Sequence, residues 1–549
     1  MTSKLTNLEI AELFERLAFF KQLAGANAFS IKAFTNAAKF MENFMGDPSS
    51  EDMSQHTGIG EKIAKAIKEA ALTGTMPELE KFKTEYPDVF DLTRIAGVGP
   101  KRALKFFESY NVKTRPELLI LLENETIKDA KLLEAVKFSL TAAERMPRYM
   151  VEQRLIPLID ALKPLTSKME FVGSMRRKKE SIKDVDILVV TNDRETVMKT
   201  FMTFGNVLSQ GPDKCSIQID GGAIKFQTDL LCTTNESWGA ALNYFTGSKE
   251  HNIVLRTMAK SRGLTVNEYG IFDGDKKLGG ENETDLYNIL NLPYVPPELR
   301  EGSDVWHTVP DIISRADIVC DTHMHTHHSD GKNSVEEMVA AAKAAGVKCI
   351  GISDHVANAF YGNSLMTNAK ARKDWLEAID AARQQYPELK IFKGAEVDIS
   401  AEGEVGLPPN AEELDYVIAS AHTVPHNNLT ERFLKAIQNP LVAILGHVTG
   451  REYSKRSEGQ ADWPRVFEAC AKANVALEIN GAPGRLDLPE HLVKLAIQKG
   501  CKIICNSDAH NVKMINADLE NAVSVARRAG LTKANLITDF EQFLKTRHH

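Results

Sequence analysis

Hydrophobic and polar positions divide the chain into segments with different periodicities. In residues 1–148, apolar residues recur at helical spacing, and no alternating run interrupts them. From about residue 150 the pattern mixes helices with alternating runs such as Asp184–Val190 and Ile224–Leu231, which predict strands. A proline-rich connector follows over residues 291–317. The pattern therefore predicts a helical N-terminal part and then a mixed α and β part.

Beyond residue 317, short β-rich runs alternate with helical segments. We predict seven strands, at residues 318–325, 349–355, 391–396, 416–422, 442–447, 475–480 and 503–510. A regular repeat of strand and helix predicts a parallel barrel, which gathers its functional side chains at the C-terminal ends of its strands. The expected fold of this part is therefore a closed α/β barrel.

Histidines and carboxylates follow these predicted strands. Thirteen of the 15 histidines lie in residues 301–549, where 33 acidic side chains also exceed 27 basic ones. His323 and His325 are two residues apart, so a strand would point both to one side. Candidate ligands end six of the seven runs or lie in the loop after the first: His323, His325, Asp330, His355, Glu396, His422, His447, Asp508 and His510. One such histidine alone would usually be a buried structural residue, but the whole set indicates a metal site.

A second group of carboxylates lies in the middle of the chain. Asp184 and Asp186 would share one face of a strand, and we expect Asp229 to end a neighbouring strand. Three such carboxylates suit two hard cations, which can activate an attacking oxygen and neutralise a leaving group. Upstream, Gly173 and Ser174 offer N–H and hydroxyl donors to a polyphosphate, and Arg177 offers a charged fork. Each motif alone is common, yet together they indicate a nucleotidyltransferase palm.

Two breaks in the helical part share the pattern Gly-apolar-Gly, and we expect a helix to begin at the lysine that follows. The residues are Gly58, Gly60 and Lys62 in the first break and Gly97, Gly99 and Lys101 in the second. Glycines let a turn approach a ligand closely, and the N–H groups at the start of a helix attract anions. The two turns resemble helix-hairpin-helix elements, which bind DNA phosphates without reading sequence. The alternative is a pair of plain turns between helices.

Composition narrows the class of protein. At 549 residues the chain has the length of about three to five domains. Its seven cysteines form no CxxC pair, which fits a reducing cytoplasm. There is no apolar run of membrane-spanning length and no export leader, so we expect a cytoplasmic protein without a membrane partner. We exclude His548 and His549 from the ligand candidates because a terminal pair of histidines is typical of a tag remnant.

Further motifs resemble a known family across nearly the whole chain. The segment from Tyr244 to Ser248, with Asn252, Arg256 and the sequence Asn-Glu-Tyr-Gly at 267–270, resembles the sugar-binding and minor-groove segment of family X DNA polymerases, the DNA polymerase beta-like enzymes. The segment Asp321–Gly331, with the later Ser-Asp-His, Ser-Ala-His and Ser-Asp-Ala-His motifs, resembles a polymerase and histidinol phosphatase (PHP) domain. The order of these motifs is similar to that of bacterial and archaeal family X polymerases with a C-terminal PHP domain.

The resemblance implies a multidomain fold. We expect N-terminal all-α helix-hairpin-helix domains, an α+β nucleotidyltransferase palm and a C-terminal (β/α)7 PHP barrel. The expected segments are a helical N-terminal domain at 1–75, a helical DNA-binding domain at 76–148, the palm at 149–235, a subdomain that binds the nascent base pair at 236–300, a linker at 301–317 and the PHP domain at 318–549.

For the polymerase part, the resemblance implies specific roles. Asp184, Asp186 and Asp229 would hold two Mg²⁺ ions, and Asp229 would also assist deprotonation of the primer 3′-hydroxyl. The incoming dNTP would be bound by Gly173, Ser174, Arg177, Tyr244, Phe245, Gly247, Ser248, Asn252 and Arg256. Tyr244, Phe245 and Gly247 would crowd out a 2′-hydroxyl. For Tyr244 and Phe245 the alternative is plain core packing.

For the PHP part, the resemblance implies up to three ions held by the nine ligands named above. A shell of imidazole and carboxylate groups suits Mn²⁺ or Zn²⁺ and does not choose between them. The expected reaction is 3′ to 5′ exonuclease action, with related cleavage at abasic sites or blocked 3′ ends.

Two positions depart from the family pattern. Animal relatives carry a Schiff-base lysine after the first hairpin, where this chain has Ala66, and Lys62 and Lys65 lie on other faces of the helix because each residue turns it by ~100°. We therefore assign no deoxyribose-phosphate lyase activity. Leu231 stands where related polymerases often have a basic residue two positions beyond the third aspartate, so contacts of the aspartates are expected to differ.

Two other functions stay open at this point. The PHP site alone could hydrolyse a small phosphomonoester such as histidinol phosphate, which would leave residues 1–300 unexplained. The chain could also be a DNA-end-binding scaffold without catalysis. The leading hypothesis is a monomeric repair polymerase that takes gapped or primed double-stranded DNA and dNTPs, fills short gaps and carries its own nuclease.

Overall fold

The computed structural model describes most of the chain as two compact units. The described residues are 7–43, 48–56, 59–95, 98–141, 145–220, 225–301, 308–356, 369–422, 428–451 and 458–547. One unit comprises residues 1–144 with 222–225, and the other comprises 145–221 with 226–549. Among the described helices, none combines the length and the apolar character that a membrane span requires.

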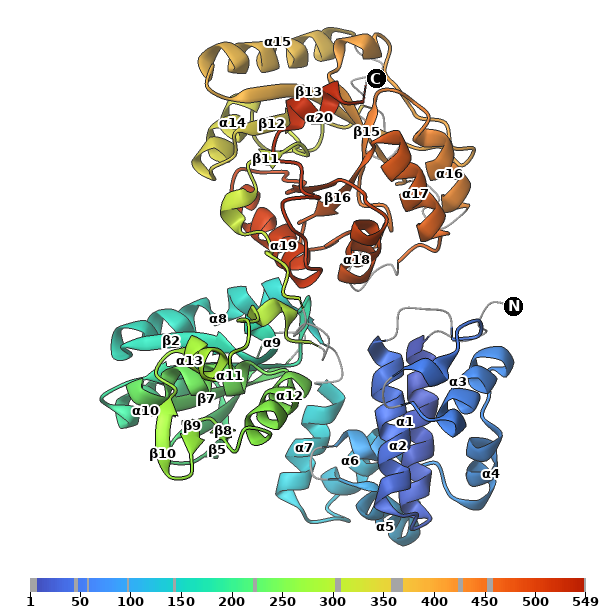
Figure 1. Ribbon diagram of the computed structural model, residues 1–549, viewed down its shortest axis with the longest axis vertical. Coiled ribbons are helices and arrows are strands. Elements are labelled where there is room, and N and C mark those ends of the chain that lie inside the picture. Colours follow the sequence, from blue (N-terminus) through green and yellow to red (C-terminus); the bar gives the residue numbers. More distant parts are fainter. Residues whose placement is uncertain are drawn as a thin grey trace. The chain divides into compact units, whose positions relative to one another are not determined.

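The first unit is helical, as predicted. Its α-helices are α1 (Asn7–Leu23), α2 (Ala28–Asn43), α3 (Glu61–Thr73), α4 (Pro77–Glu85), α5 (Pro100–Tyr110), α6 (Arg115–Glu123) and α7 (Ala130–Thr141), with short 3-10 turns at Met53–Gln55 and Phe90–Arg94. Helices α1 and α2 lie side by side (Figure 1). Their apolar faces form a core that includes Phe14, Phe20 and Phe34, and the rings of Phe14 and Phe34 stack at 5.9 Å.

The two helices predicted after the glycine turns are present, but they begin earlier than predicted. Gly60 and Gly99 are the N-caps of α3 and α5, so the helices start at Glu61 and Pro100 and not at the lysines. An extended backbone at each glycine places the next residue directly in the first helical turn. Pro100 suits that place because it has no N–H to satisfy.

The second unit begins with a five-stranded sheet in the order β2-β4-β7-β6-β5. The elements are β1 (Met146–Pro147), α8 (Arg148–Leu162), β2 (Lys168–Val172), α9 (Gly173–Arg176), β3 (Ser181–Ile182), β4 (Asp184–Val190), α10 (Arg194–Met202), β5 (Asn206–Gln210), β6 (Lys214–Asp220) and β7 (Lys225–Thr233). Strand β4 pairs with β7 in parallel and with β2 antiparallel. Asp229 lies within β7 and not at its end as predicted, because β7 stays paired with β4 as far as Thr233.

A smaller α and β region follows. It contains α11 (Trp238–Thr246), α12 (Lys249–Lys260), β8 (Thr265–Asn267), β9 (Gly270–Asp273), β10 (Lys276–Gly279) and α13 (Glu283–Ile289), and its three strands form an antiparallel sheet. A buried ion-pair network joins it to the region of the five-stranded sheet. Arg176 on α9 donates two hydrogen bonds to Glu283 on α13, at 2.7 and 2.8 Å, and Arg300 donates a third at 2.7 Å.

The last part is the predicted parallel barrel. Its strands, neighbours in chain order, are β11 (Cys320–Asp321), β12 (Cys349–Ile352), β13 (Lys390–Asp398), β14 (Tyr416–Ser420), β15 (Val442–Leu445), β16 (Ala476–Asn480) and β17 (Ile503–Asn506). The helices are α14 (Val335–Ala344), α15 (Ala369–Gln385), α16 (Leu429–Ala436), α17 (Trp463–Ala473), α18 (Glu490–Gln498), α19 (Met514–Arg528) and α20 (Phe540–Lys545). Helices α14 to α19 surround the strands (Figure 1). The prediction of a seven-stranded α/β barrel is confirmed.

The first and last barrel strands are shorter than predicted. Side chains take over the hydrogen bonds where the two ends meet: Asn506 accepts from the Thr322 N–H at 2.8 Å, and Asp321 accepts from the Ser507 N–H at 3.1 Å. Further along, a bridge between Met324 and Ala509 links the two segments. The metal-ligand candidates of both segments therefore stand just after the regular strands, where the backbone is free to turn the side chains inward.

Candidate active sites

Three aspartates meet on the five-stranded sheet. Asp184 and Asp186 are two residues apart on β4, and Asp186 is the direct register partner of Asp229 on β7. The carboxylate of Asp229 is held from both sides, since Gln227 donates to Oδ1 at 2.8 Å and Lys214 of β6 forms an ion pair with Oδ2. The structure thus brings the three predicted carboxylates together on adjacent parallel strands.

The charge at this site is dominated by carboxylates. Burial and the neighbouring carboxylates of Asp184 and Asp229 raise the pKa of Asp186 to about 6, although the positive charges of Lys214 and Arg177 oppose the rise. Repulsion of this kind is relieved when divalent cations bind between carboxylates. The donor set therefore fits the two Mg²⁺ ions that the sequence predicts.

Gly173 and Arg177 lie beside these aspartates. Gly173 has φ +60°, and a Cβ there would come within 2.7 Å of Asp186 Oδ2, so only glycine lets the backbone approach this closely. Arg177 donates from Nε to Glu301 at 2.8 Å and from Nη1 to the Thr246 carbonyl. Ser174 lies on the short helix α9 between the two.

The other predicted nucleotide contacts cluster around the end of α11 and the start of α12. The rings of Tyr244 and Phe245 meet edge to face at 5.2 Å. The Asn252 amide donates to the Tyr244 carbonyl at 2.7 Å, and Arg256 donates from Nε to the Asn252 carbonyl at 3.2 Å. Phe245 also packs against a cluster of buried residues that includes Leu188 and Leu231. Core packing, the alternative to a nucleotide contact, therefore accounts for part of its surroundings.

Gly247 and Ser248 connect the two helices of this cluster. Gly247 is the C-cap of α11 with φ +69°, and a Cβ at this position would lie 3.2 Å from Arg177 Nη1. Ser248 is the N-cap of α12, and its hydroxyl accepts from the His251 N–H at 3.3 Å. The structure therefore places the turn between the helices against the guanidinium of Arg177.

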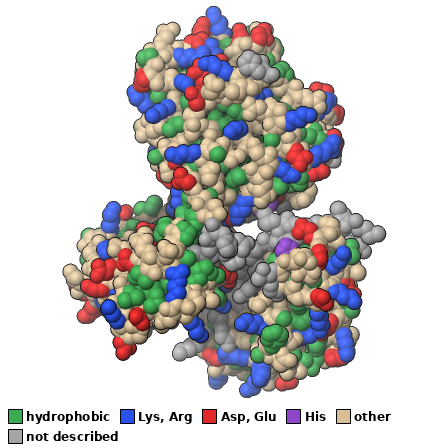
Figure 2. All heavy atoms as spheres, viewed as in Figure 1, with side chains coloured by type: hydrophobic (Ala, Val, Ile, Leu, Met, Phe, Trp, Pro, Cys, Tyr) green, Lys and Arg blue, Asp and Glu red, His purple; other side chains and the backbone are tan. Residues whose placement is uncertain are grey.

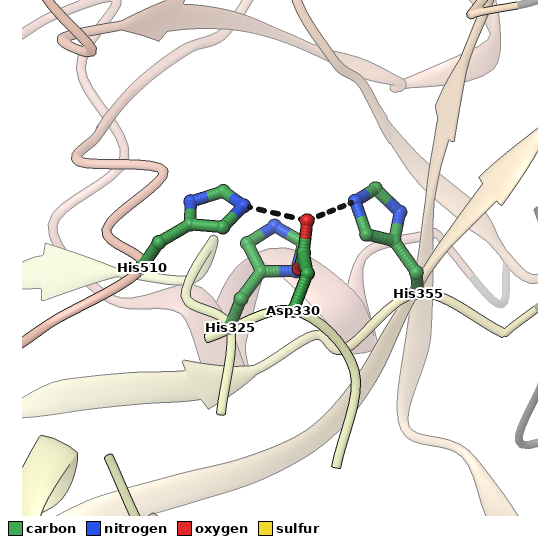
Figure 3. A group of neighbouring side chains, drawn as sticks. All are labelled: His325, Asp330, His355 and His510. Carbon is green, nitrogen blue, oxygen red and sulfur yellow. Dashed lines mark ion pairs between the residues drawn. The ribbon is translucent and has the colours of Figure 1, made fainter. Parts of the chain in front are cut away.

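The barrel carries a dense group of histidines and carboxylates. Three subsets have ligand atoms within 4.8 Å of one another: His325, Asp330, His355 and His510; His323, His325 and Asp508; and His355, Glu396 and His422. In the first subset, drawn in Figure 3, Asp330 lies between the rings of His510, at 3.3 Å, and His355, at 3.7 Å. The barrel thus brings eight of the nine predicted ligands into these subsets.

Glu396 is the centre of the group. It lies on β13 with its side chain 1% exposed, and five imidazoles reach its oxygens: His447 at 2.8 Å, His422 and His355 at 3.2 Å, His323 at 3.3 Å and His325 at 3.5 Å. His447, the ninth predicted ligand, joins the group through this contact. A carboxylate surrounded in this way can bridge ions that the imidazoles hold.

Unsatisfied buried nitrogens support metal binding here. Among the described residues, Nε2 of His323 and both ring nitrogens of His325 are buried without a hydrogen-bond partner. Buried polar atoms without partners are rare, and a metal ion is one of the groups that satisfies them. Imidazole and carboxylate donors in this mixture fit Mn²⁺ or Zn²⁺ equally.

The pKa values of the histidines follow their carboxylate neighbours. Burial lowers the pKa of His422, but Glu396 and Asp398 outweigh burial and raise it to about 9. The pKa of His510 also rises to about 9, because Asp330 and Asp508 outweigh burial. His355 is dominated by burial, which lowers its pKa to about 4. The carboxylates are therefore placed to compensate positive charge at the site, whether of protons or of metal ions.

Sequence reasoning missed the residues that orient these ligands. Glu478 on β16 accepts from Nδ1 of His323 at 2.7 Å, and Asp398 on β13 is 2.8 Å from Nδ1 of His422. A carboxylate at the other ring nitrogen fixes the tautomer and direction of a metal-binding histidine. For Glu478 a signal existed, since it is the single charged residue in the one predicted strand without a ligand, at residues 475–480.

The predicted DNA contacts of the first unit are described in part. Lys62 and Lys101 are each in the first turn of α3 and α5, close to the free N–H groups of those helices. Gly58 and Gly97 lie outside the described residues. On the face that Figure 2 shows, Lys and Arg side chains are interspersed with Asp and Glu, and they form no single basic band over the described surface. The hairpin turns therefore remain the specific candidates for phosphate contacts.

Three family models match the chain. A helix-hairpin-helix domain matches residues 5–76, a DNA polymerase beta thumb matches residues 241–301, and a PHP domain matches residues 321–482. These matches cover the first hairpin, the Tyr244–Arg256 segment and most of the barrel ligands. The three matches follow the order of motifs that the sequence predicts.

Curated proteins similar to this chain include polymerases and a phosphatase. The chain is 24% identical over 331 residues to DNA polymerase lambda of Rattus norvegicus, which covers 54% of this chain and 56% of that protein. It is 32% identical over 204 residues to a probable phosphatase of Caldicellulosiruptor saccharolyticus, which covers 35% of this chain and 79% of that protein. It is 31% identical over 573 residues to DNA polymerase/3′-5′ exonuclease PolX of Bacillus subtilis, which covers 98% of this chain and 99% of that protein. The chain therefore belongs to the family X DNA polymerases that carry a C-terminal PHP domain.

Proposed function

We propose that this protein extends DNA primers across short gaps during repair and removes nucleotides from 3′ ends with its PHP barrel. The observation that carries the proposal is the presence of two separate acidic sites in one chain. One is the set Asp184, Asp186 and Asp229 on the palm, and the other is the nine-residue set centred on Glu396. The two sites share no residue, so one chain can carry out both synthesis and degradation.

In the polymerase reaction, the aspartates and the bound nucleotide would be arranged on the palm sheet. Two Mg²⁺ ions supply a Lewis acid for the attacking and leaving oxygens when they are bound. Asp229 receives or relays the proton of the primer 3′-hydroxyl, and Lys214 and Gln227 hold its two oxygens in place. Ser174 and Arg177 bind the triphosphate as donors, which fixes the α-phosphate in line with the primer end.

The sugar and base would lie against the end of α11 and the start of α12. Tyr244, Phe245 and Gly247 form one wall, where a 2′-hydroxyl would meet the aromatic rings and the backbone. Asn252 and Arg256 share one face of α12, from which they would reach the minor-groove edge of the nascent pair. This part of the site selects deoxynucleotides and a correctly shaped pair.

In the PHP reaction, the barrel would hold up to three Mn²⁺ or Zn²⁺ ions, which supply an activated water and neutralise the phosphodiester. Glu478 and Asp398 orient His323 and His422, and the carboxylates of Asp330, Glu396 and Asp508 balance the charge of the cluster. Hydrolysis at the 3′-terminal linkage releases one nucleotide at a time. The same attack of water on phosphorus would cleave the phosphodiester at an abasic site or release a blocking group from a 3′ end.

The remaining assignments concern domains and partners. The hairpin turns of residues 1–75 and 76–148 bind the phosphates beside the gap, the palm is 149–235, and the nascent-pair subdomain is 236–300. A linker at 301–317 leads to the PHP domain at 318–549. The protein acts as a cytoplasmic monomer on gapped or primed double-stranded DNA, with dNTPs as its second substrate.

A single labelled substrate tests the proposal. A 5′-labelled primer on a gapped duplex is incubated with the protein in Mg²⁺ or Mn²⁺, with and without dNTPs. Longer products with dNTPs and shorter products without them are expected. No extension in either metal would exclude the polymerase function.

A second candidate function is hydrolysis of small phosphomonoesters by the barrel. The similarity of about a third of the chain to a probable phosphatase favours testing it. Turnover of histidinol phosphate that exceeds the degradation of DNA would make the phosphomonoester the preferred substrate. A scaffold role without catalysis would require that Asp184→Ala and Asp186→Ala leave every activity unchanged.

A further inference from the structure

Helix α19 of the barrel ends directly at the palm. Its last residue, Arg528, has a side chain that is only 2% exposed. Nη1 of Arg528 donates to the main-chain carbonyl of Arg177 at 2.8 Å and pairs with Oε1 of Glu301 at 3.2 Å. The same Oε1 accepts from Nε of Arg177 at 2.8 Å. Arg177 and Arg528 therefore share one carboxylate oxygen, and Arg528 also holds the backbone of Arg177.

This shared carboxylate is part of a partly buried charge network, in which the side chain of Glu301 is 25% exposed. Lys179 reaches Oε2 of Glu301 at 3.2 Å, and Nη2 of Arg528 forms an ion pair with Glu490. Burial would raise the pKa of Glu301, but Arg177, Lys179 and Arg528 together lower it to about 2. If one member of such a network moves away, the remaining charges lose their partners, which is energetically costly. The members therefore keep their relative positions.

The network fixes the direction of the Arg177 guanidinium. A guanidinium is flat and has five N–H groups in fixed directions. One of them, on Nε, is bound to Glu301, and another, on Nη1, is bound to the Thr246 carbonyl. Two such bonds set the plane of the group, and with it the direction of the N–H groups that remain for a ligand. The guanidinium also lies against the turn between α11 and α12, where a Cβ at Gly247 would be 3.2 Å from Nη1 of Arg177.

We propose that Arg528 of the PHP domain is a positioning residue for nucleotide binding by the polymerase. Through Glu301 and the Arg177 backbone, it orients the guanidinium that binds the triphosphate. The proposal rests on the triphosphate-binding role proposed above for Arg177. The PHP domain then serves the polymerase reaction as well as its own hydrolysis, because α19 extends from the barrel to the nucleotide site.

Arg527, the neighbouring residue, provides a matched control. It also lies at the end of α19, and it joins the barrel to the residues just before Glu301, with hydrogen bonds to Glu298 at 2.7 and 3.2 Å and to the Ile313 carbonyl at 2.7 Å. Its described bonds involve neither Arg177 nor Glu301. A loss of packing between barrel and palm would affect both arginines, whereas loss of guanidinium positioning affects Arg528 alone.

The experiment compares the full-length parent protein with Arg528→Gln, Arg528→Lys and Arg527→Gln. Single-nucleotide extension of a gapped primer is measured over a range of dNTP concentrations, and degradation of the same primer is measured without dNTPs. We expect Arg528→Gln to raise KM for dNTP by about tenfold, the effect of one lost charge-assisted contact, with a smaller change in kcat. Arg528→Lys should recover part of this loss, and Arg527→Gln should resemble the parent. Unchanged degradation shows that the barrel of each variant is folded.

Two results would overturn the proposal: an unchanged KM in Arg528→Gln, or an equal rise in Arg527→Gln. If Arg528→Gln does not fold, Glu301→Gln replaces it, since this variant keeps the size of the shared acceptor and removes its charge. An unchanged KM in Glu301→Gln also refutes the proposal. Arg177→Ala in the same assay tests the triphosphate-binding role of Arg177 separately from the positioning role of Arg528. An unchanged KM in this variant refutes the role of Arg177 itself. A parent protein that does not extend the primer refutes the polymerase function.

Discussion

Nζ of Lys214, at the first residue of β6, forms an ion pair with Oδ2 of Asp229 on the adjacent strand β7. Related polymerases often carry a basic residue two positions beyond this aspartate, where this chain has the buried Leu231. The positive charge paired with Asp229 therefore comes from a neighbouring strand. Because Lys214 is about half exposed, it can leave the carboxylate when a divalent cation arrives.

Replacement of Lys214 by Ala should lower the Mg²⁺ concentration needed for half-maximal extension. Without the lysine the site is more negative, and no ammonium group competes with the ion for Asp229. An exposed ion pair is worth about 0.2–1 kcal/mol, so the change should be at most about fivefold. Lys214→Arg, which keeps the charge, should behave like the parent. A higher Mg²⁺ requirement in Lys214→Ala would mean that the lysine mainly positions Asp229.

The two active sites should be separable by mutation. Asp186→Asn should reduce primer extension by about 100-fold or more, because it removes an ion ligand, and should leave degradation unchanged. His323→Ala should have the reverse effect, because His323 contacts Glu396 and Asp508 in the barrel. Both rates are measured on one labelled gapped duplex. His491→Ala, an exposed barrel histidine outside the ligand set, is the control. Equal loss of both activities in either variant would contradict the separation.

The pattern of hydrophobic and polar residues predicted those parts of the fold that depend on short stretches of sequence. The seven barrel strands and their ligands were predictable because each strand is a short β-rich run and each ligand lies on its strand or in the loop directly after it. The three aspartates were predictable for the same reason. Strand ends were less certain, because they depend on pairing with a neighbour: Asp229 lies within β7 because β4 continues beside it.

The contacts that support the sites were not predictable in this way. His323 and Glu478 are 155 residues apart in sequence, and Arg177 and Glu301 are 124 apart. No periodicity relates such pairs, because the barrel and the domain junction bring them together only after folding. The role of Arg528 is of the same kind, since its sequence neighbours contain no nucleotide-binding motif.

The contact between Glu478 and His323 can be tested by mutation. Glu478→Gln keeps the size of the side chain but removes the charge that holds Nδ1 of His323 at 2.7 Å. Loss of such a partner typically costs 10- to 100-fold in metal affinity or activity. We therefore expect the degradation rate at limiting Mn²⁺ to fall by about 10- to 100-fold. Extension by the same protein serves as the internal control. An unchanged degradation rate would mean that Glu478 does not orient His323.

The carboxylate of Glu283 joins α13 to Arg176 of α9 and to Arg300. Glu283 accepts from Arg176 at 2.7 and 2.8 Å and from Arg300 at 2.7 Å, and its side chain is 8% exposed. Burial would raise the pKa of Glu283, but hydrogen bonding and charge from Arg176 and Arg300 lower it from 4.5 to about 2. The folded protein therefore prefers the ionised form more strongly than the unfolded chain does.

This pKa shift predicts a stability that depends on pH. A carboxylate with a lowered pKa stabilises the fold fully above its unfolded pKa, and the stabilisation is lost as pH falls from 4.5 toward 2. The shift corresponds to about 3 kcal/mol at pH 7 and about 1 kcal/mol at pH 3. Glu283→Gln should therefore lower the opening free energy of α13, measured by hydrogen exchange, by about 3 kcal/mol at pH 7, and the difference from the parent should narrow at pH 3. Glu281→Gln, an exposed neighbour, should have little effect at either pH. A difference that stays constant between pH 7 and pH 3 would show that ionisation of Glu283 does not stabilise the junction.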